Sequence, residues 1–135
     1  MTRINLVPVE TLTDQHLIAE YRELPRVFTL ALKAYGKPIV IPAEYVLGPG
    51  HVKFFYNKLK FLVNRQKALI VECKKRGFKI SQENIDFDFP DPWYNDYSPS
   101  EKDIQLSQSR LDEKIAQKPE WYKYYGEPNE LRRTS

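Results

Sequence analysis

The chain has 135 residues, 41% hydrophobic and 13% aromatic, a composition that fits one folded domain with a modest core and excludes a disordered chain. Its one cysteine excludes an internal disulfide and a Cys-rich metal or iron–sulfur centre, two histidines give little support to a zinc site, and no apolar run approaches the roughly 20 residues of a membrane span. The net charge is +3, but residues 1–80 carry a net +8 and residues 81–105 a net −6, so a basic part and an acidic stretch are separate along the chain.

The first residues, Met1-Thr2-Arg3, carry a candidate nucleophile. Because Thr2 is small, we expect removal of the initiator methionine, which leaves a free α-amine with a pKa of about 7.7–8.0 and therefore partly neutral at neutral pH. A carboxylate such as Glu23, held near this amine, could serve a reaction that begins with amine attack on an electrophilic carbon. Without further support, the alternative reading is an ordinary frayed chain end.

A first helix is predicted from Thr13 or Asp14, both good N-caps, to about Tyr35. Pro25 lies inside it and predicts a kink or break. The buried stripe is predicted to consist of Leu17, Tyr21, Leu24, Phe28, Ala31 and Tyr35.

The opposite side of this helix is basic, with Arg22, Arg26 and Lys33, and His16 and Glu23 lie together at its flank. Charge pairing on a solvated helix explains Glu20 well. It explains Glu23 less well, because Arg22 and Arg26 are like charges four residues apart unless an anion lies across them. A basic face favours a polyanionic partner, with nucleic acid as the leading candidate, although on charge alone a solvated surface is an equally good explanation.

The segment 36–52 contains three Pro and three Gly and is predicted to be a loop. A second helix is predicted over about Val52 to Arg76, with room for a break, and Gly77 is a suitable residue to terminate it. Its inner stripe is predicted to comprise Leu59, Leu62, Gln66, Leu69 and Cys73. We expect Cys73 to be a small buried hydrophobe, and Phe54, Phe55 and Tyr56 beside His51 to be core rather than site.

Residues 78–97 are acidic, aromatic and Pro-containing, and predict a long irregular connection. A third helix is predicted to start with Ser98 as N-cap and Glu101 completing a capping box, and to end by Lys118. The tail then has four aromatic residues and one lysine, Trp121, Tyr122, Lys123, Tyr124 and Tyr125, before a polar end at 127–135. Such aromatics can stack on exposed bases. The alternative is that they cover the core, which we favour for Trp121.

The chain resembles the pyrimidine-dimer DNA glycosylase and abasic-site lyase family of the phage endonuclease V type. Near its start the resemblance rests on Met-Thr-Arg-Ile-Asn-Leu at 1–6, Asp-Gln-His-Leu at 14–17 and Ala-Glu-Tyr-Arg-Glu-Leu-Pro-Arg-Val-Phe at 19–28. Further on it rests on Gly-His-Val at 50–52, Phe-Phe-Tyr at 54–56, Arg-Leu-Asp-Glu-Lys-Ile-Ala-Gln at 110–117 and Trp-Tyr-Lys-Tyr-Tyr-Gly at 121–126. These segments span nearly the whole chain, whereas the loop around 36–48, the stretch 81–100 and the last residues depart from the family pattern.

The resemblance implies a mainly α, single compact domain over residues 1–135, with three principal helices, long irregular connections and an N-terminal segment that passes between helices. It also implies cleavage of the 5′ pyrimidine's glycosidic bond at ultraviolet-induced cyclobutane dimers in duplex DNA, through an imine with the Thr2 amine, followed by β-elimination at the abasic site. Thr2 and Glu23 are then the catalytic residues, and no cofactor or metal is needed. The DNA-binding residues implied are Arg3, Gln15, His16, Arg22, Arg26, Arg110, Lys114, Trp121, Tyr122, Lys123, Tyr124 and Tyr125.

The expected partner is therefore duplex DNA containing pyrimidine dimers or abasic sites. We expect a monomer with no membrane contact, cytoplasmic and DNA-associated, because the N-terminus lacks an export signal. Two alternatives stay open: a catalytically silent module that binds damaged DNA, and a metal-dependent nuclease, against which the sparse set of metal ligands argues.

Overall fold

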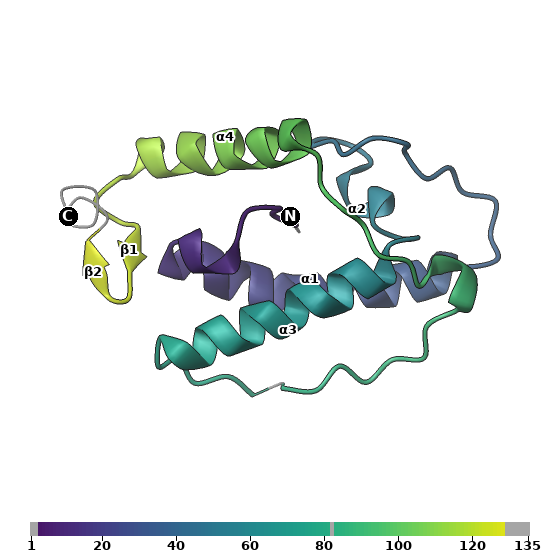
Figure 1. The fold of residues 1–135 in the computed structure, drawn as a ribbon, viewed down its shortest axis with the longest axis horizontal. Coiled ribbons are helices and arrows are strands. Elements are labelled where there is room, and N and C mark those ends of the chain that lie inside the picture. Colours follow the sequence, from purple (N-terminus) through teal and green to yellow (C-terminus); the bar gives the residue numbers. More distant parts are fainter. Residues whose placement is uncertain (1–2, 82, 129–135) are drawn as a thin grey trace.

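Three long helices make up most of the regular structure in the computed structural model, which describes residues 3–81 and 83–128 (Figure 1). They are α1 (Asp14–Ala34), α3 (Leu59–Lys75) and α4 (Glu101–Gln117). The smaller elements are the short helix α2 (His51–Phe54), 3-10 turns at Val9–Thr11 and Asp91–Trp93, and an antiparallel hairpin of β1 (Lys123–Tyr124) and β2 (Glu127–Pro128). The predicted mainly helical domain with three principal helices is confirmed.

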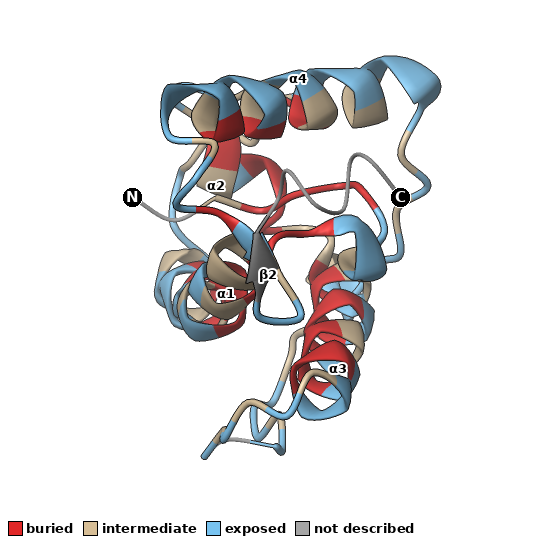
Figure 2. Ribbon diagram, turned by 90° about the vertical axis from the view of Figure 1, so that its left-hand side faces the viewer, coloured by how far each residue is buried: buried red, intermediate tan, exposed pale blue. Residues whose placement is uncertain are grey.

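The N-terminal segment runs through the middle of the molecule. Helices α1 and α3 pack against each other, and α4 lies on the other side of the N-terminal segment (Figures 1 and 2). Ile4, Leu6 and Val7 are buried in the same core cluster as the inner faces of the helices. Residues 4–7 are therefore a core element with helices on both sides, as the family resemblance implied.

Helix α1 begins where the sequence predicts, because the hydroxyl of Thr13 accepts a hydrogen bond from the His16 amide (3.1 Å). The helix continues through Pro25 without a break. The predicted stripe is buried except at Tyr35. The prediction that Tyr35 is buried is wrong, because this residue is 43% exposed. Tyr35 is the C-cap, and its extended backbone turns it away from the helix axis so that its ring meets the edge of Trp93.

The second predicted helix is divided into α2 and α3, because Lys58 has a non-helical backbone (φ −130°, ψ 42°). The predicted inner stripe of α3 is buried at every position, including Cys73. Phe54, Phe55 and Tyr56 are also buried, as predicted. Helix α3 ends in a Schellman motif, in which Phe78 donates to Cys73 and Gly77, at φ +81°, donates to Lys74.

The predicted N-cap of α4 is wrong by two residues. Ser100, not Ser98, accepts the capping hydrogen bond, from the amide of Asp103 (3.1 Å). The ring of Tyr97 packs against Phe54 and Phe61, and this contact keeps the chain extended until it has left the core. The helix ends before the Lys118 C-cap, as predicted.

The described part of the acidic connection 78–97 has no regular structure apart from its one 3-10 turn, as predicted. Six of its apolar side chains pack against the core: Phe78, Ile80, Ile85, Phe89, Trp93 and Tyr97. Within the described residues, no helix combines the length and apolar character needed to cross a membrane.

Candidate active site

The backbone of the N-terminal segment is held by side chains from distant parts of the chain. The Ile4 amide donates to Nε2 of His51 (2.8 Å), and the Ile4 carbonyl accepts from the Tyr45 hydroxyl (3.0 Å). Two residues later, the Leu6 amide donates to the hydroxyl of Ser107 on α4 (3.0 Å). A buried, irregular segment satisfies its polar groups in this way instead of through a sheet.

His51 reaches Ile4 because Gly50 allows a sharp entry into α2. Gly50 has φ +92°, and an added Cβ would lie 3.0 Å from the side chain of Pro42. Since the Val46 carbonyl can only accept, Nδ1 of His51 carries the proton and donates to it (2.6 Å), which leaves the Nε2 lone pair for Ile4. Burial lowers the pKa of His51 to about 4, against the hydrogen bond to Val46, and the charge of Arg3 adds to the lowering.

Beneath this segment lies a buried ion pair. Nε of Arg65 donates to Oε2 of Glu20 (2.7 Å) and its Nη2 donates to Oε1 (3.0 Å), while Nδ2 of the Asn5 side chain also donates to Oε1 (2.8 Å). A further guanidinium nitrogen of Arg65 donates to the Val7 carbonyl. The interpretation of Glu20 as a solvated helix charge is wrong, because its side chain is only 2% exposed and its partner Arg65 lies 45 positions away.

A pocket of about 380 Å³ opens above this layer, where the N-terminal segment, α1 and α4 meet. Its lining residues are Arg3, Asn5, His16, Ala19, Glu20, Glu23, Arg110, Leu111, Lys114 and Tyr122. Two carboxylates and three permanent cations thus face one cavity. Because Glu20 is neutralised by Arg65, Glu23 is the carboxylate available to a ligand in the pocket.

The pocket has a positive potential. The pKa of His16 is lowered to about 4, first by burial and then by the nearby charges of Lys114 and Arg110. The pKa of Arg3 is lowered by burial and by Arg110, with Tyr45 acting in the opposite direction. Among the described residues, none forms a hydrogen bond or ion pair with the side chain of Glu23, Arg110 or Lys114. At neutral pH the pocket therefore presents a neutral imidazole, an available carboxylate and cations that an anionic ligand could neutralise.

Six of the predicted site residues come together here: Arg3, His16, Glu23, Arg110, Lys114 and Tyr122. Thr2 lies outside the described residues, although its neighbour Arg3 lines the pocket. Arg22 lines an adjacent hollow that shares Ala19 with the pocket, and Arg26 faces a third hollow between α1 and residues 84–87. Both arginines are exposed.

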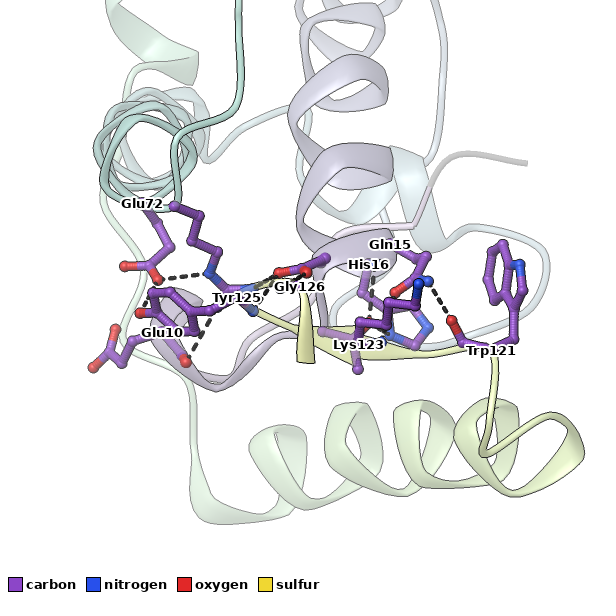
Figure 3. Close-up of polar contacts among 11 residues, drawn as sticks. Glu10, Gln15, His16, Glu72, Trp121, Lys123, Tyr125 and Gly126 are labelled. Carbon is purple, nitrogen blue, oxygen red and sulfur yellow. Dashed lines mark hydrogen bonds and ion pairs between the residues drawn. The ribbon is translucent and has the colours of Figure 1, made fainter. Parts of the chain in front are cut away.

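Gln15 holds the segment after α4 in place, as Figure 3 shows. Its side chain accepts from the Lys123 amide (3.0 Å) and donates to the Trp121 carbonyl, in the manner of a neighbouring strand. Tyr122 is thereby turned inward, where it stacks on His16 with ring centroids 4.7 Å apart. The preference for Trp121 as a core residue is wrong: its side chain is 56% exposed, and Tyr122 has the buried place. Trp121 lines the same hollow as Gln15 and Arg22.

The other aromatic residues of the tail lie away from the pocket. Asp14 accepts hydrogen bonds from the amides of Tyr125 (2.9 Å) and Gly126 (2.8 Å) and pairs with Arg76 (2.9 Å). The Tyr125 ring covers the Arg76 guanidinium, and its hydroxyl donates to Glu72 (2.6 Å; Figure 3). Lys123 and Tyr124 form β1 and do not line the pocket. The tail is thus fastened to the start of α1 and the end of α3.

The sequence analysis missed the residues that build the pocket floor and anchor the N-terminal segment: Asn5, Glu20, Tyr45, His51, Arg65 and Ser107. Only His51 had a local signal, namely its position directly after Gly50. Within residues 3–81 and 83–128, no group of three or more His, Cys, Asp or Glu side chains could hold a metal ion.

A comparison with protein families matches residues 1–86 to a family model described as pyrimidine dimer DNA glycosylase. The match covers more than half of the chain and includes α1, α2 and α3, whereas α4 and the hairpin lie outside it. Arg3, His16 and Glu23 therefore lie within the matched region, whereas Arg110, Leu111, Lys114 and Tyr122 of the pocket lining come from beyond it.

Proposed function

The chain belongs to the pyrimidine dimer DNA glycosylase family, and we propose that it is a bifunctional glycosylase and abasic-site lyase acting on cyclobutane pyrimidine dimers in duplex DNA. The observation that carries the proposal is the pocket in which Glu23 faces Arg3, Arg110 and Lys114 beside a buried N-terminal segment. A nucleophile at the chain end would enter this pocket directly from Arg3.

In the proposed reaction, the neutral amine of Thr2 attacks C1′ of the sugar that carries the 5′ pyrimidine. The bond from C1′ to the base nitrogen breaks, and the base takes the bonding electrons and a proton from the attacking amine. The bond from C1′ to the ring oxygen O4′ then breaks, O4′ takes up a proton as a hydroxyl, and the nitrogen forms a C=N double bond to C1′, the imine of the opened sugar. Loss of a C2′ proton then expels the 3′ phosphate oxygen by β-elimination, which cuts the strand. No external oxidant or reductant is needed.

The pocket residues suit the two electrostatic requirements of these steps. The positive potential of Arg3, Arg110 and Lys114 disfavours a protonated amine and so lowers its pKa, which increases the nucleophilic fraction. Glu23 can stabilise the positive charge that develops on the sugar and can assist proton transfers. The same cations can neutralise the phosphates that flank the lesion.

DNA contacts are proposed to extend from the pocket along α1 and the tail. Arg22 and Trp121 line the hollow next to the pocket. Arg22 offers a cation to the DNA backbone, and Trp121 offers an exposed ring to a base. Arg26 lies one turn further along the same helix. We propose contacts of the same kind for Lys123 and Tyr124 on β1, which continues this surface, and a supporting role for Tyr125.

The deciding experiment is borohydride trapping on duplex DNA with a single cyclobutane thymine dimer, in the presence of a chelator and with the N-terminus checked by mass spectrometry. A covalent adduct mapped to Thr2 is expected. If the correctly processed protein binds the dimer but gives no adduct and no cleavage, the silent damage-binding module is the better description. If a chelator abolishes cleavage, the reaction depends on a metal instead.

A further inference from the structure

The first peptide units of the described chain are held more tightly than a chain terminus requires. Ile4 is fully buried and both of its backbone polar groups are hydrogen-bonded to side chains, the amide to His51 and the carbonyl to Tyr45. Chain ends are ordinarily among the least ordered parts of a protein. Anchoring of this kind indicates that the position of the N-terminus has a use.

We propose that His51 is a positioning residue, which fixes the Ile4 amide and so sets the point from which the N-terminal amine reaches into the Glu23 pocket. This inference rests on the proposed function. Two residues of fully extended chain span at most about 7 Å, so anchoring the nitrogen of Ile4 sets an upper limit of that size on the distance from Ile4 to an amine on Thr2. A restricted nucleophile reacts faster than a mobile one, because its entropy has already been lost on folding.

The imidazole is suited to this task because it cannot easily be displaced or reoriented. The ring of His51 is 1% exposed, contacts the edges of Tyr45 and Phe55, and is locked in one tautomer by the Val46 carbonyl. Its Nε2 is therefore a bare acceptor aimed at the Ile4 amide.

Tyr45 also anchors Ile4, through the carbonyl of that residue. Its hydroxyl holds the Ile4 carbonyl, so His51 and Tyr45 together fix the plane of the peptide bonds on both sides of this residue. The guanidinium of Arg3 donates to the Leu47 carbonyl, which connects the preceding residue to the same 45–47 segment. The segment 45–47, here called the cradle, therefore holds Arg3 and Ile4 in place.

The test compares His51→Leu with His51→Gln, whose side-chain oxygen can replace Nε2 as the acceptor. Single-turnover trapping by borohydride is measured on dimer DNA, together with the dissociation constant for the same DNA under non-reducing conditions. We expect His51→Leu to slow trapping by about a hundredfold with an unchanged dissociation constant, and His51→Gln to recover most of the rate. Equal trapping rates in wild type and a folded His51→Leu would overturn the proposal.

A second measurement keeps the proposal testable if His51→Leu does not fold. Tyr45→Phe removes only the hydroxyl that holds the Ile4 carbonyl, and we expect it to slow trapping about tenfold at an unchanged dissociation constant. Unchanged trapping by Tyr45→Phe would count against the cradle. If wild type itself gives no adduct, the proposed function fails rather than this inference.

Hydrogen exchange supplies a readout that does not depend on activity. In the folded His51→Gln and His51→Leu variants, we expect faster exchange of the Ile4 amide only in the leucine variant. The Leu6 amide, held by Ser107, should keep its protection in both and is the internal control. Wild-type protection of Ile4 in the leucine variant would contradict the anchor.

Discussion

The side-chain amide of Gln66 on α3 donates a hydrogen bond to the Tyr21 carbonyl on α1 (3.1 Å). This is the carbonyl that the residue four positions later would normally satisfy, and that residue is Pro25, which has no N–H. A side chain 45 positions away thus replaces the missing helical hydrogen bond. This relationship explains why α1 is continuous where the sequence predicts a kink or break.

Gln66→Leu should therefore destabilise the protein by about 1–3 kcal/mol, because the buried Tyr21 carbonyl loses its donor. The free energy of unfolding in urea measures the effect. In a Pro25→Ala background the helix supplies its own N–H, so the same substitution should cost less, with a coupling energy of about 1 kcal/mol in the double-mutant cycle. Additive effects would show that Gln66 does not compensate for Pro25.

Glu23→Gln should reduce dimer cleavage by at least about a hundredfold while the dissociation constant for dimer DNA stays within a few fold. The carboxylate charge is lost, but the shape of the pocket is preserved. Glu113→Gln on α4 is the matched control, since Glu113 is exposed and does not line the pocket. Near-normal cleavage by Glu23→Gln would remove this residue from the proposed mechanism.

Lys114→Ala should weaken binding to dimer DNA and reduce the slope of log K against log salt concentration by about 1, as expected for one lost phosphate contact. Lys102→Ala is the control on the same helix, because Lys102 is exposed and absent from the pocket lining. Binding titrations at several salt concentrations measure both slopes. An equal change in both variants would point to general charge rather than to a contact at the pocket.

Stability should fall as the pH is lowered from about 6.5 towards 4. The folded pKa of His51 is lowered to about 4, so between these values the unfolded state binds a proton that the folded state does not. For this buried ring the loss amounts to about 3 kcal/mol, complete once the pH is below the folded pKa. His16, whose pKa is also lowered to about 4, acts in the same direction.

Urea unfolding at pH 7 and pH 4.5 measures this loss, and His51→Gln isolates its main source. The glutamine variant cannot take up the proton, so its stability should depend less on pH over this range than that of wild type. An identical pH dependence in the two proteins would mean that His51 is not buried in its neutral form.

Gln15→Ala should weaken binding to dimer DNA severalfold without a comparable loss of global stability. The side chain holds the backbone at Trp121 and Lys123, and its removal would free Tyr122 from its stack on His16. Binding titrations, with limited tryptic cleavage after Lys123 as a readout of the tail, test this expectation. If proteolysis is faster but binding is unchanged, Gln15 holds the tail in place without contributing to the recognition of DNA.

The sequence by itself determined the presence of the long helices and the inner face of α3, because these depend on local effects. A period of 3.6 residues identified the buried stripe of α3, the capping side chains of Thr13 and Asp14 predicted the start of α1, and Gly77 predicted the end of α3. Of the pocket residues, His16 and Glu23 on α1 were also found from their shared flank of the helix, and Arg110 and Lys114 on α4 through family resemblance.

Only the tertiary structure decided the burial of Glu20 and of Tyr122. Glu20 and Glu23 are three positions apart on one helix, yet the first is paired with Arg65 in the interior and the second faces the pocket. Trp121 and Tyr122 are adjacent, and Gln15 decides which of them turns inward. A charge or a polar ring is stable in the core only where a partner reaches it, and here the partners lie dozens of positions away. The helical pattern of the sequence contains no information about those distant contacts.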